Sequence, residues 1–354
     1  GNGHVNNLIL LISKSKTLKA LSLANTHISK NNLASIIDAI NANQNITKMS
    51  LNLDNLNLNG EDLNYVLGAF KLEGDQGFLK KWNKLSFASN SLDLPDLELL
   101  LPVLSTLPKL RFIDLSDNFN DSMDGISSLL GRLTKLSSLK SIVLRGKAKN
   151  KLKNKLKKFL KKASEMESLE KLDVRNHHCS ESGELFATLL QQCELNTLRC
   201  SGNDFTPDEV KTLIKSIPDS LVTFDFPMND CRQYLSELRD IEREEPVEEA
   251  NMVKELQIRA TKRMAKNRQD VGCELPFECS ETAEKVIREL STEQTELLDS
   301  IKEKKLFTHS FITEIFNLPF PFEKNSDLIS TNETESTYYD KKILKKYGER
   351  DQAE

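Results

Sequence analysis

The chain has 354 residues, a formal charge of −4 and 29 % charged residues, a composition that predicts an ordinary soluble surface. No stretch reaches the roughly 18 apolar residues that a membrane-spanning helix needs. The N-terminus shows no basic segment followed by an apolar run, so nothing in it indicates secretion. Its six cysteines include no CxxC pair, and we expect reduced, buried thiols and a cytoplasmic location.

A leucine-rich pattern recurs along the first 231 residues. Its clearest copy is LRFIDLSDN at 110–118, which has the form Leu-x-x-Leu-x-Leu-x-x-Asn with isoleucine at the second apolar position. With the first apolar residue as zero, apolar residues recur at +3, +5 and +10, and a polar residue recurs at +8. The units start at Leu18, Ile46, Trp82, Leu110, Leu139, Leu169, Leu195 and Leu221. Such units are typical of a leucine-rich repeat, in which the asparagine caps backbone groups where the chain bends.

The second half of each unit predicts a helix. The starts lie 26 to 36 residues apart, which leaves room for a full helix after each strand. Apolar residues then recur three or four apart, and Thr206 before Pro207 is a helix-start signal. The segment 73–77 is predicted to be a loop insertion. Residues 5–16 resemble the helical half of a repeat without its strand, so we expect a partial first repeat in a piece of a longer protein.

The predicted fold is therefore an α/β leucine-rich-repeat horseshoe of the ribonuclease-inhibitor type, with ~28-residue repeats over residues 1–231. Its concave face, taken at +2, +4 and +6, is small and polar in the first half and rich in arginine and aspartate in the second. We predict protein binding there, with Arg145, Arg175 and Arg199 as anchors. The alternative is that these charges form a ladder of mutual salt bridges. The candidate partner-binding residues are Phe112, Asp114, Arg145, Lys171, Asp173, Arg175, Arg199 and Asp225.

A basic run is the most unusual composition in the chain. Residues 145–162 contain ten lysines or arginines and no acid, and the apolar residues among them fall on one helical face. We predict weak contact with anionic membranes through a basic patch; the alternative is an ordinary solvated outer face. Phe159 faces inward, so bases have no stacking platform and specific nucleic-acid recognition is not expected. The patch comprises Lys151, Lys153, Lys157, Lys158 and Lys161.

No catalytic or cofactor motif is found in the sequence, and we predict that the chain is not an enzyme. His177, His178 and Cys179 are adjacent, but His177 takes the asparagine position of its repeat and Cys179 an inward position. A zinc site needs three or four ligands, so no metal site is predicted.

The repeats end near residue 231, and two further regions are predicted. Residues 232–324 form a helical capping or dimerisation region, and residues 325–354 form a flexible polar tail with a short basic helix. One helical face is too long for a single neighbouring turn to cover, and it predicts either packing on the solenoid end or a homodimer. That face comprises Val286, Leu290, Leu297, Ile301, Phe311 and Phe316.

Two segments carry a resemblance to a known family. Residues 224–230 read FDFPMND, and a later helix contains Lys266, Asn267 and Arg268. With the long repeats, these features resemble the CARMIL family of actin regulators, in which the last repeat ends in a Pro-x-x-Asp turn before a helix with a basic-Asn pair. The resemblance spans roughly residues 1 to 300. It implies an upstream pleckstrin-homology-like domain, a helical dimerisation domain and a tail that binds capping protein. This chain shows no match to that tail motif.

Three functions follow as hypotheses. The first is a non-enzymatic scaffold for actin-regulatory protein partners near membranes. The second is a GTPase-activating protein, because one such family is built from long leucine-rich repeats; Arg145, Arg175 or Arg199 would order the nucleotide. The third is a general adaptor unrelated to actin.

Overall fold

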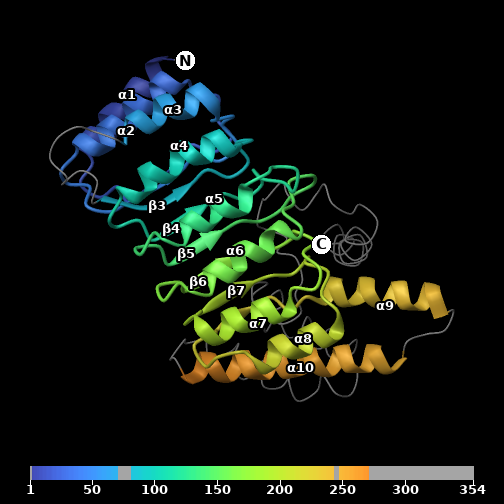
Figure 1. The fold of residues 1–354 in the computed structure, drawn as a ribbon. Coiled ribbons are helices and arrows are strands. Elements are labelled where there is room, and N and C mark those ends of the chain that lie inside the picture. The colour runs from blue at the N-terminus through green and yellow to red at the C-terminus, as the bar shows by residue number, and fades with distance from the viewer. Residues whose placement is uncertain (1, 71–80, 243–246, 271–354) are drawn as a thin grey trace, which may run out of the picture. The chain divides into compact units, whose positions relative to one another are not determined.

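A computed structural model describes residues 2–70, 81–242 and 247–270. In it, eight parallel strands form one sheet in chain order (Figure 1). The strands are β1 (Ala20–Ser22), β2 (Met49–Asn52), β3 (Trp82–Ser86), β4 (Phe112–Asp114), β5 (Ser141–Val143), β6 (Lys171–Asp173), β7 (Thr197–Arg199) and β8 (Thr223–Phe224). The predicted leucine-rich-repeat fold is confirmed by this topology.

Helices lie between the strands on one side of the sheet, each packed against the helix of the next repeat (Figure 1). They are α1 (Asn2–Lys14), α2 (Lys30–Ala42), α3 (Gly60–Gly68), α4 (Leu94–Ser105), α5 (Ile126–Leu133), α6 (Lys155–Ala163), α7 (Gly183–Gln192) and α8 (Pro207–Lys215). Two longer helices follow, α9 (Met228–Glu242) and α10 (Val247–Asp270). The predicted helix start at Thr206 and Pro207 is confirmed, and the structure adds a capping box in which Thr206 and Glu209 cap each other's backbone.

The core is a ribbon of apolar side chains between the sheet and the helices. The +3 residues Leu85, Ile113, Ile142, Leu172 and Leu198 are all buried, because alternate residues of a strand point to the same face. Burying one such side chain stabilises the fold by about 1.5–3 kcal/mol. Each repeat contributes a few of these residues, so the stability of the solenoid is distributed along its length.

The register of the second repeat differs from the prediction. Leu51 pairs with Leu21 and with Leu85, both at +3, so this repeat starts at residue 48 and not at Ile46. A shift of two residues keeps every side chain on the same face of the strand. It moves Asp54 from the expected cap position to the open face of the sheet, which we define as the face opposite the helices.

In the third and fourth repeats, the asparagine at +8 ties the repeat to the one before it. Asn90 accepts hydrogen bonds from the backbone N–H groups of Leu56 and Leu58 at 2.9 and 3.0 Å. Asn118 does the same for Asn90 and Leu92, at 2.9 and 3.2 Å. A buried N–H without a partner costs about 1–3 kcal/mol, so each of these two repeats completes the turn of its predecessor.

In the last repeat an aspartate performs this role. Asp230 accepts hydrogen bonds from the backbone N–H groups of Gly202 and Asn203, at 2.9 to 3.2 Å. The residue at +8 is Asn229, but α9 begins at Met228 and rotates the next side chain into place.

A buried lysine closes the end of α2. Lys81 donates hydrogen bonds from Nζ to the carbonyl oxygens of Ile40, Asn41 and Asn43 at 2.8 to 2.9 Å. These carbonyls carry the partial negative charge of a helix C-terminus, which a cation complements. Burial nevertheless lowers the pKa of Lys81 below its usual value.

Helix α10 covers the last repeat, packing on α8 and β8. Its buried face holds Val253, Leu256, Ala260 and Met264. Between repeats, a carbonyl accepts from the backbone of the following repeat, as Asn196 does from Val222 and Thr223.

In the last repeat, the equivalent carbonyl is that of Val222, and in the described part of the chain no further repeat follows to donate a hydrogen bond to it. Arg268 donates to it from Nε at 2.8 Å. Asn267 donates from Nδ2 to the carbonyls of Pro218 and Leu221, at 2.8 and 2.7 Å. We call Asn267 and Arg268 the carbonyl clamp, because together they replace donors that another repeat would supply.

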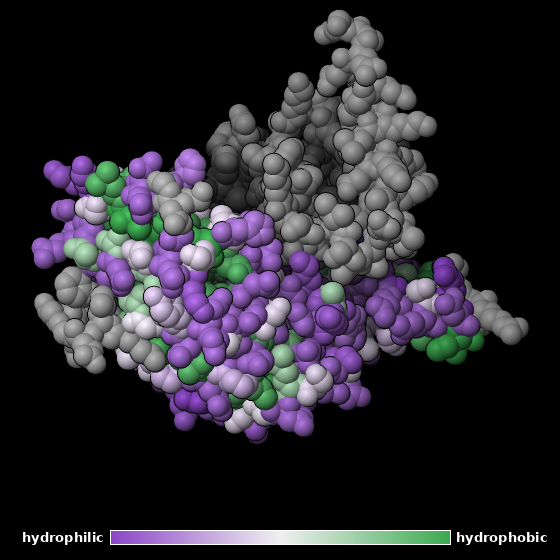
Figure 2. All heavy atoms as spheres, turned by 90° about the horizontal axis from the view of Figure 1, so that it is seen from above, coloured by the Kyte–Doolittle hydropathy of each residue, from purple (hydrophilic) through white to green (hydrophobic). Residues whose placement is uncertain are grey.

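Few large apolar side chains are exposed in the described part of the chain: Leu10, Leu11, Tyr65, Ile241 and Val247. Figure 2 accordingly shows small separate apolar patches within a mostly hydrophilic surface. No helix among the described residues is both long and apolar enough to cross a membrane. The predicted insertion at 73–77, the predicted dimer or cap face from Val286 to Phe316 and the predicted tail lie outside the described residues.

Candidate interaction surfaces

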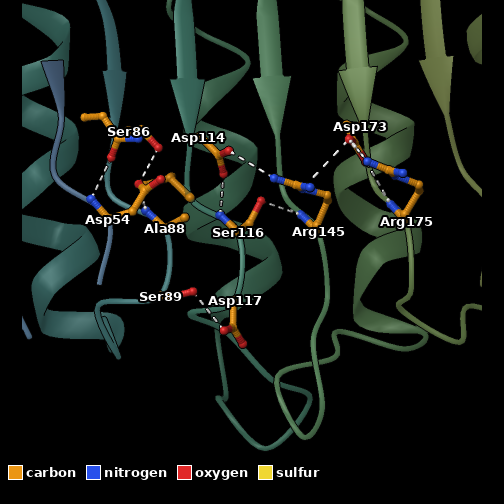
Figure 3. Close-up of polar contacts among 12 residues, drawn as sticks. Asp54, Ser86, Ala88, Ser89, Asp114, Ser116, Asp117, Arg145, Asp173 and Arg175 are labelled. Atoms are coloured by element: carbon orange, nitrogen blue, oxygen red, sulfur yellow. Dashed lines mark hydrogen bonds and ion pairs between the residues drawn. The ribbon is translucent and has the colours of Figure 1, made fainter. Parts of the chain in front are cut away.

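A row of alternating charges crosses the open face of the sheet at the carboxyl ends of the strands (Figure 3). It is formed by Asp114, Arg145, Asp173 and Arg175. The buried carboxylate of Asp225 in the last repeat extends the row, because it interacts with the charge of Arg175. Strands place +4 and +6 residues of neighbouring repeats side by side, so residues of the fourth, fifth and sixth repeats meet in the row. Five of the eight predicted partner-binding residues therefore form one network.

The two arginines are held differently. Arg175 binds Asp173 with two hydrogen bonds, from Nε at 3.0 Å and from Nη2 at 2.8 Å, a bidentate geometry that fixes the guanidinium plane. Arg145 lies between two carboxylates, with Nη2 3.8 Å from Asp114 and Nε 3.9 Å from Asp173. Its Nε is buried without a hydrogen-bond partner, so Arg145 contributes charge more than directed bonds.

Burial dominates the electrostatics of the aspartates in this row. It raises the pKa of Asp114 to about 6, while hydrogen bonds from Ser116 and the charge of Arg145 act in the opposite direction. The pKa of Asp225 is likewise raised by burial, and Arg175 partly offsets this effect. The arginines thus act as counter-charges that oppose the effect of burial on the pKa of these carboxylates.

The other three predicted residues are placed apart from this row. Lys171 is exposed and Arg199 is half-buried, and neither forms an ion pair with a described residue. Phe112 is half-buried near the amino end of β4, with the ammonium of Lys84 5.8 Å from its ring centre, a cation–π distance.

The basic patch is split between a loop and a helix. Helix α6 begins at Lys155, so Lys151 and Lys153 precede it. Lys153 pairs with Asp121 at 2.8 Å, and Lys157 with Glu181 at 3.8 Å. Lys158 and Lys161 are exposed and unpaired among the described residues. Part of the basic run therefore ties neighbouring repeats together.

His177 occupies the position that asparagine holds in other repeats. Its Nδ1 accepts from the backbone N–H of Leu152 at 3.0 Å, and its Nε2 bonds the carbonyl of Leu144. Burial lowers its pKa to about 4. Cys179 is buried and free, and burial raises its pKa to about 11. No group of three or more metal-ligating side chains occurs among the described residues.

This geometry predicts a pH effect on stability. Because the pKa of His177 is about 4 in the fold against 6.5 for free histidine, the unfolded chain binds more protons between these values. Stability is therefore lost as the pH falls below 6.5. An asparagine at position 177 can form both hydrogen bonds without a ring that titrates. At about pH 5, His177→Asn should therefore gain up to about 2 kcal/mol of stability over the wild type, compared with the difference between the two proteins at about pH 8. Thermal denaturation at both pH values measures this, with the exposed His4→Asn as control; equal pH dependence of both variants would contradict it.

Comparisons with known proteins add little. No family model matches the chain, and no curated protein matches it. Among solved structures, the chain is similar to a tropomodulin C-terminal domain from Caenorhabditis elegans, with 17 % sequence identity and a TM-score of 0.29. That match covers 48 % of this chain and 81 % of the other.

Sequence reasoning placed Ser116 on the open face at +6 of its repeat, but it missed Asp54 as a member of that face. Asp54 accepts from the hydroxyl of Ser86 and from the backbone N–H of Ala88 (Figure 3). The hydroxyl of Ser116 accepts from the backbone N–H of Arg145 at 2.9 Å. A register that places Leu53 at +5 would have revealed Asp54 at +6.

Proposed function

We propose that this chain is a non-enzymatic, cytoplasmic protein-interaction scaffold that regulates the actin cytoskeleton near membranes, as a CARMIL-like protein. One observation carries the proposal. The residues of the CARMIL-like basic-Asn pair are the carbonyl clamp, in which Asn267 and Arg268 bind carbonyls of the last repeat. That two of the residues on which the resemblance rests bind the end of the repeats in this chain supports the proposal.

The surfaces suit protein partners. The charge row fixes its aspartates and arginines before any partner arrives, and such preorganisation lowers the entropic cost of binding. Lys171 and Arg199 remain unpaired on the same face among the described residues. The four cysteines in the described part are buried and free, which supports a reducing compartment.

The experiment is co-sedimentation with actin filaments, together with the assembly rate of labelled actin monomers. We expect the chain to bind filaments or to change the assembly rate. Lys171→Glu with Arg199→Glu should weaken the effect by about fivefold or more, because each lost contact with a partner costs about 0.5–1 kcal/mol. Lys149→Glu with Lys158→Glu changes the net charge equally on another surface and should leave the effect intact.

A chain that neither binds filaments nor alters assembly would contradict the actin assignment and leave the general adaptor. The GTPase-activating hypothesis is weaker than either. Its arginine must be free to reach a nucleotide. Arg145 and Arg175 are engaged with carboxylates of the open face, which leaves only Arg199 of the three candidates.

A further inference from the structure

The amino ends of the strands carry a charge pattern that the proposed function does not use. In the first five repeats, the segments that lead into and begin the strands contain lysine or arginine and no acid; these are residues 15–20, 43–50, 81–84, 106–112 and 134–141. In the sixth repeat the pattern reverses, since residues 164–171 contain Glu165, Glu167 and Glu170. The ion pair between Lys140 and Glu170 marks the boundary.

The cations before this boundary are available for binding. We call them the amino-end stripe: Lys16, Lys19, Lys48, Lys84, Lys109, Arg111 and Lys135, all exposed. None of them forms an ion pair within the described residues. By contrast, Lys147, Lys153 and Lys157 of the basic run do have carboxylate partners.

Each of the first five repeats contributes at least one cation to the stripe. The strand residues Ser50, Lys84, Phe112 and Ser141 are register partners across four strands; Lys84 is the only cation among these four, and the other cations precede this row in their repeats. Parallel strands lie about 4.8 Å apart, so the stripe offers roughly one cation per such step. A helix rises about 5.4 Å per turn, and a helix with one carboxylate per turn therefore matches this row closely.

Phe112 gives the stripe an apolar centre. It is half-buried, and Lys84 covers its ring at 5.8 Å. An aromatic side chain flanked by cations is typical of protein–protein hot spots. A single half-buried ring is a poor platform for stacked bases, and it does not project as an anchor for lipid would.

We propose that the amino-end stripe binds an acidic helical segment of a protein partner, one that presents a carboxylate on each turn and an apolar residue near Phe112. The inference rests on the proposed role as a protein scaffold, and it adds the chemistry of the partner. The carboxyl-end charge row is internally neutralised, whereas the stripe is not, so the acidic partner meets the amino ends of the strands.

The test uses the full chain and a labelled alanine-rich peptide of about 20 residues, long enough to form a helix in water, with glutamate at every fourth position. A second peptide has glutamine at those positions. Fluorescence anisotropy at low salt should show binding of the glutamate peptide and not of the glutamine peptide, because exposed charges are screened little at low ionic strength.

Lys84→Glu, Arg111→Glu and Lys135→Glu together should weaken that binding by about tenfold or more. The matched control reverses Lys149, Lys211 and Lys215, which are exposed, form no ion pair with a described residue and lie outside both the stripe and the basic patch; binding should then change by less than about twofold. Thermal melting of both variants establishes that they fold. Equal losses in the two variants would overturn the proposal.

Two further probes separate other classes of partner. If phosphatidylserine vesicles or a single-stranded oligonucleotide bind through the stripe and the glutamate peptide does not, the polypeptide assignment is wrong. Actin co-sedimentation distinguishes this proposal from the proposed function. If the chain binds the peptide but not actin, the proposal for the stripe stands and the cytoskeletal role is wrong. If it binds actin but not the peptide, the cytoskeletal role stands and the proposal for the stripe is wrong.

Discussion

Replacing both Asn267 and Arg268 by alanine should unfold the C-terminal end of the solenoid before the rest. The change leaves the carbonyls of Leu221 and Val222 without their side-chain donors, whereas the carbonyl of Pro218 keeps the backbone N–H of Leu221. A buried polar group left unpaired costs about 1–3 kcal/mol, so with two such carbonyls the double variant should lose about 2–6 kcal/mol of local stability. Because repeats interact only with their neighbours, the loss should stay near the last two repeats.

Hydrogen exchange measures this directly. Amides of β8 and α8 should exchange much faster in the double variant, while those of β2 and β3 keep their rates. Lys266→Ala is the control, since Lys266 is exposed on the same turn of α10 and makes no contact with the last repeat that would be lost. A uniform increase in exchange along all repeats would show that the solenoid unfolds as one unit and would contradict the prediction.

Asp230→Asn should stabilise the fold at alkaline pH. Burial raises the pKa of Asp230 to about 7, and the charges of Asp204 and Asp225 act in the same direction. The native state therefore holds a proton that the unfolded chain releases above pH 3.8, the usual value. The stability falls as the pH rises between these two values and then levels off. The difference corresponds to at most about 4 kcal/mol at about pH 8.

Asparagine can replace the aspartate because Asn90 and Asn118 perform the same function in earlier repeats without a charge. We expect wild type and Asp230→Asn to differ little at about pH 4 and the variant to melt several degrees higher at about pH 8. Asp240→Asn removes the same charge from an exposed site of α9 and should leave the pH profile unchanged. A variant that is less stable than wild type at both pH values would show that the carboxylate is needed for its hydrogen bonds.

The repeat architecture could be predicted from the sequence because it depends on local periodicity. Apolar residues at +3 and +5 point inward wherever a strand forms, and all eight predicted strands are present. The register of the second repeat could not be predicted, because an alternating strand that moves by two residues keeps its faces. Leu51 and Leu53 therefore fit the pattern as well as Met49 and Leu51 do.

Local sequence patterns could not predict the hydrogen-bond and ion-pair partners of individual polar side chains. The positions of Arg145 and Asp173 on one face were predicted, but their pairing depends on which repeats lie in register, and the ladder alternative was the better description for Arg145 and Arg175. Lys81 is separated from the carbonyls that it binds by about 40 residues of chain. No window of sequence shows that this lysine is buried.

The hydrogen bonds of the +8 residues also determine when each turn can form during synthesis. The backbone N–H groups of Leu56 and Leu58 have no protein acceptor until Asn90 has been synthesised, and the N–H of Asn90 has none until Asn118 has been synthesised. Ribosomes add roughly 5–20 residues per second, so every nascent turn spends a few seconds with unpaired amides until its successor leaves the exit tunnel. The final turn is completed only when α10 emerges, because Asn267 and Arg268 donate to its carbonyls. A ribosome that stalls before that point leaves a growing chain whose last repeat is uncovered.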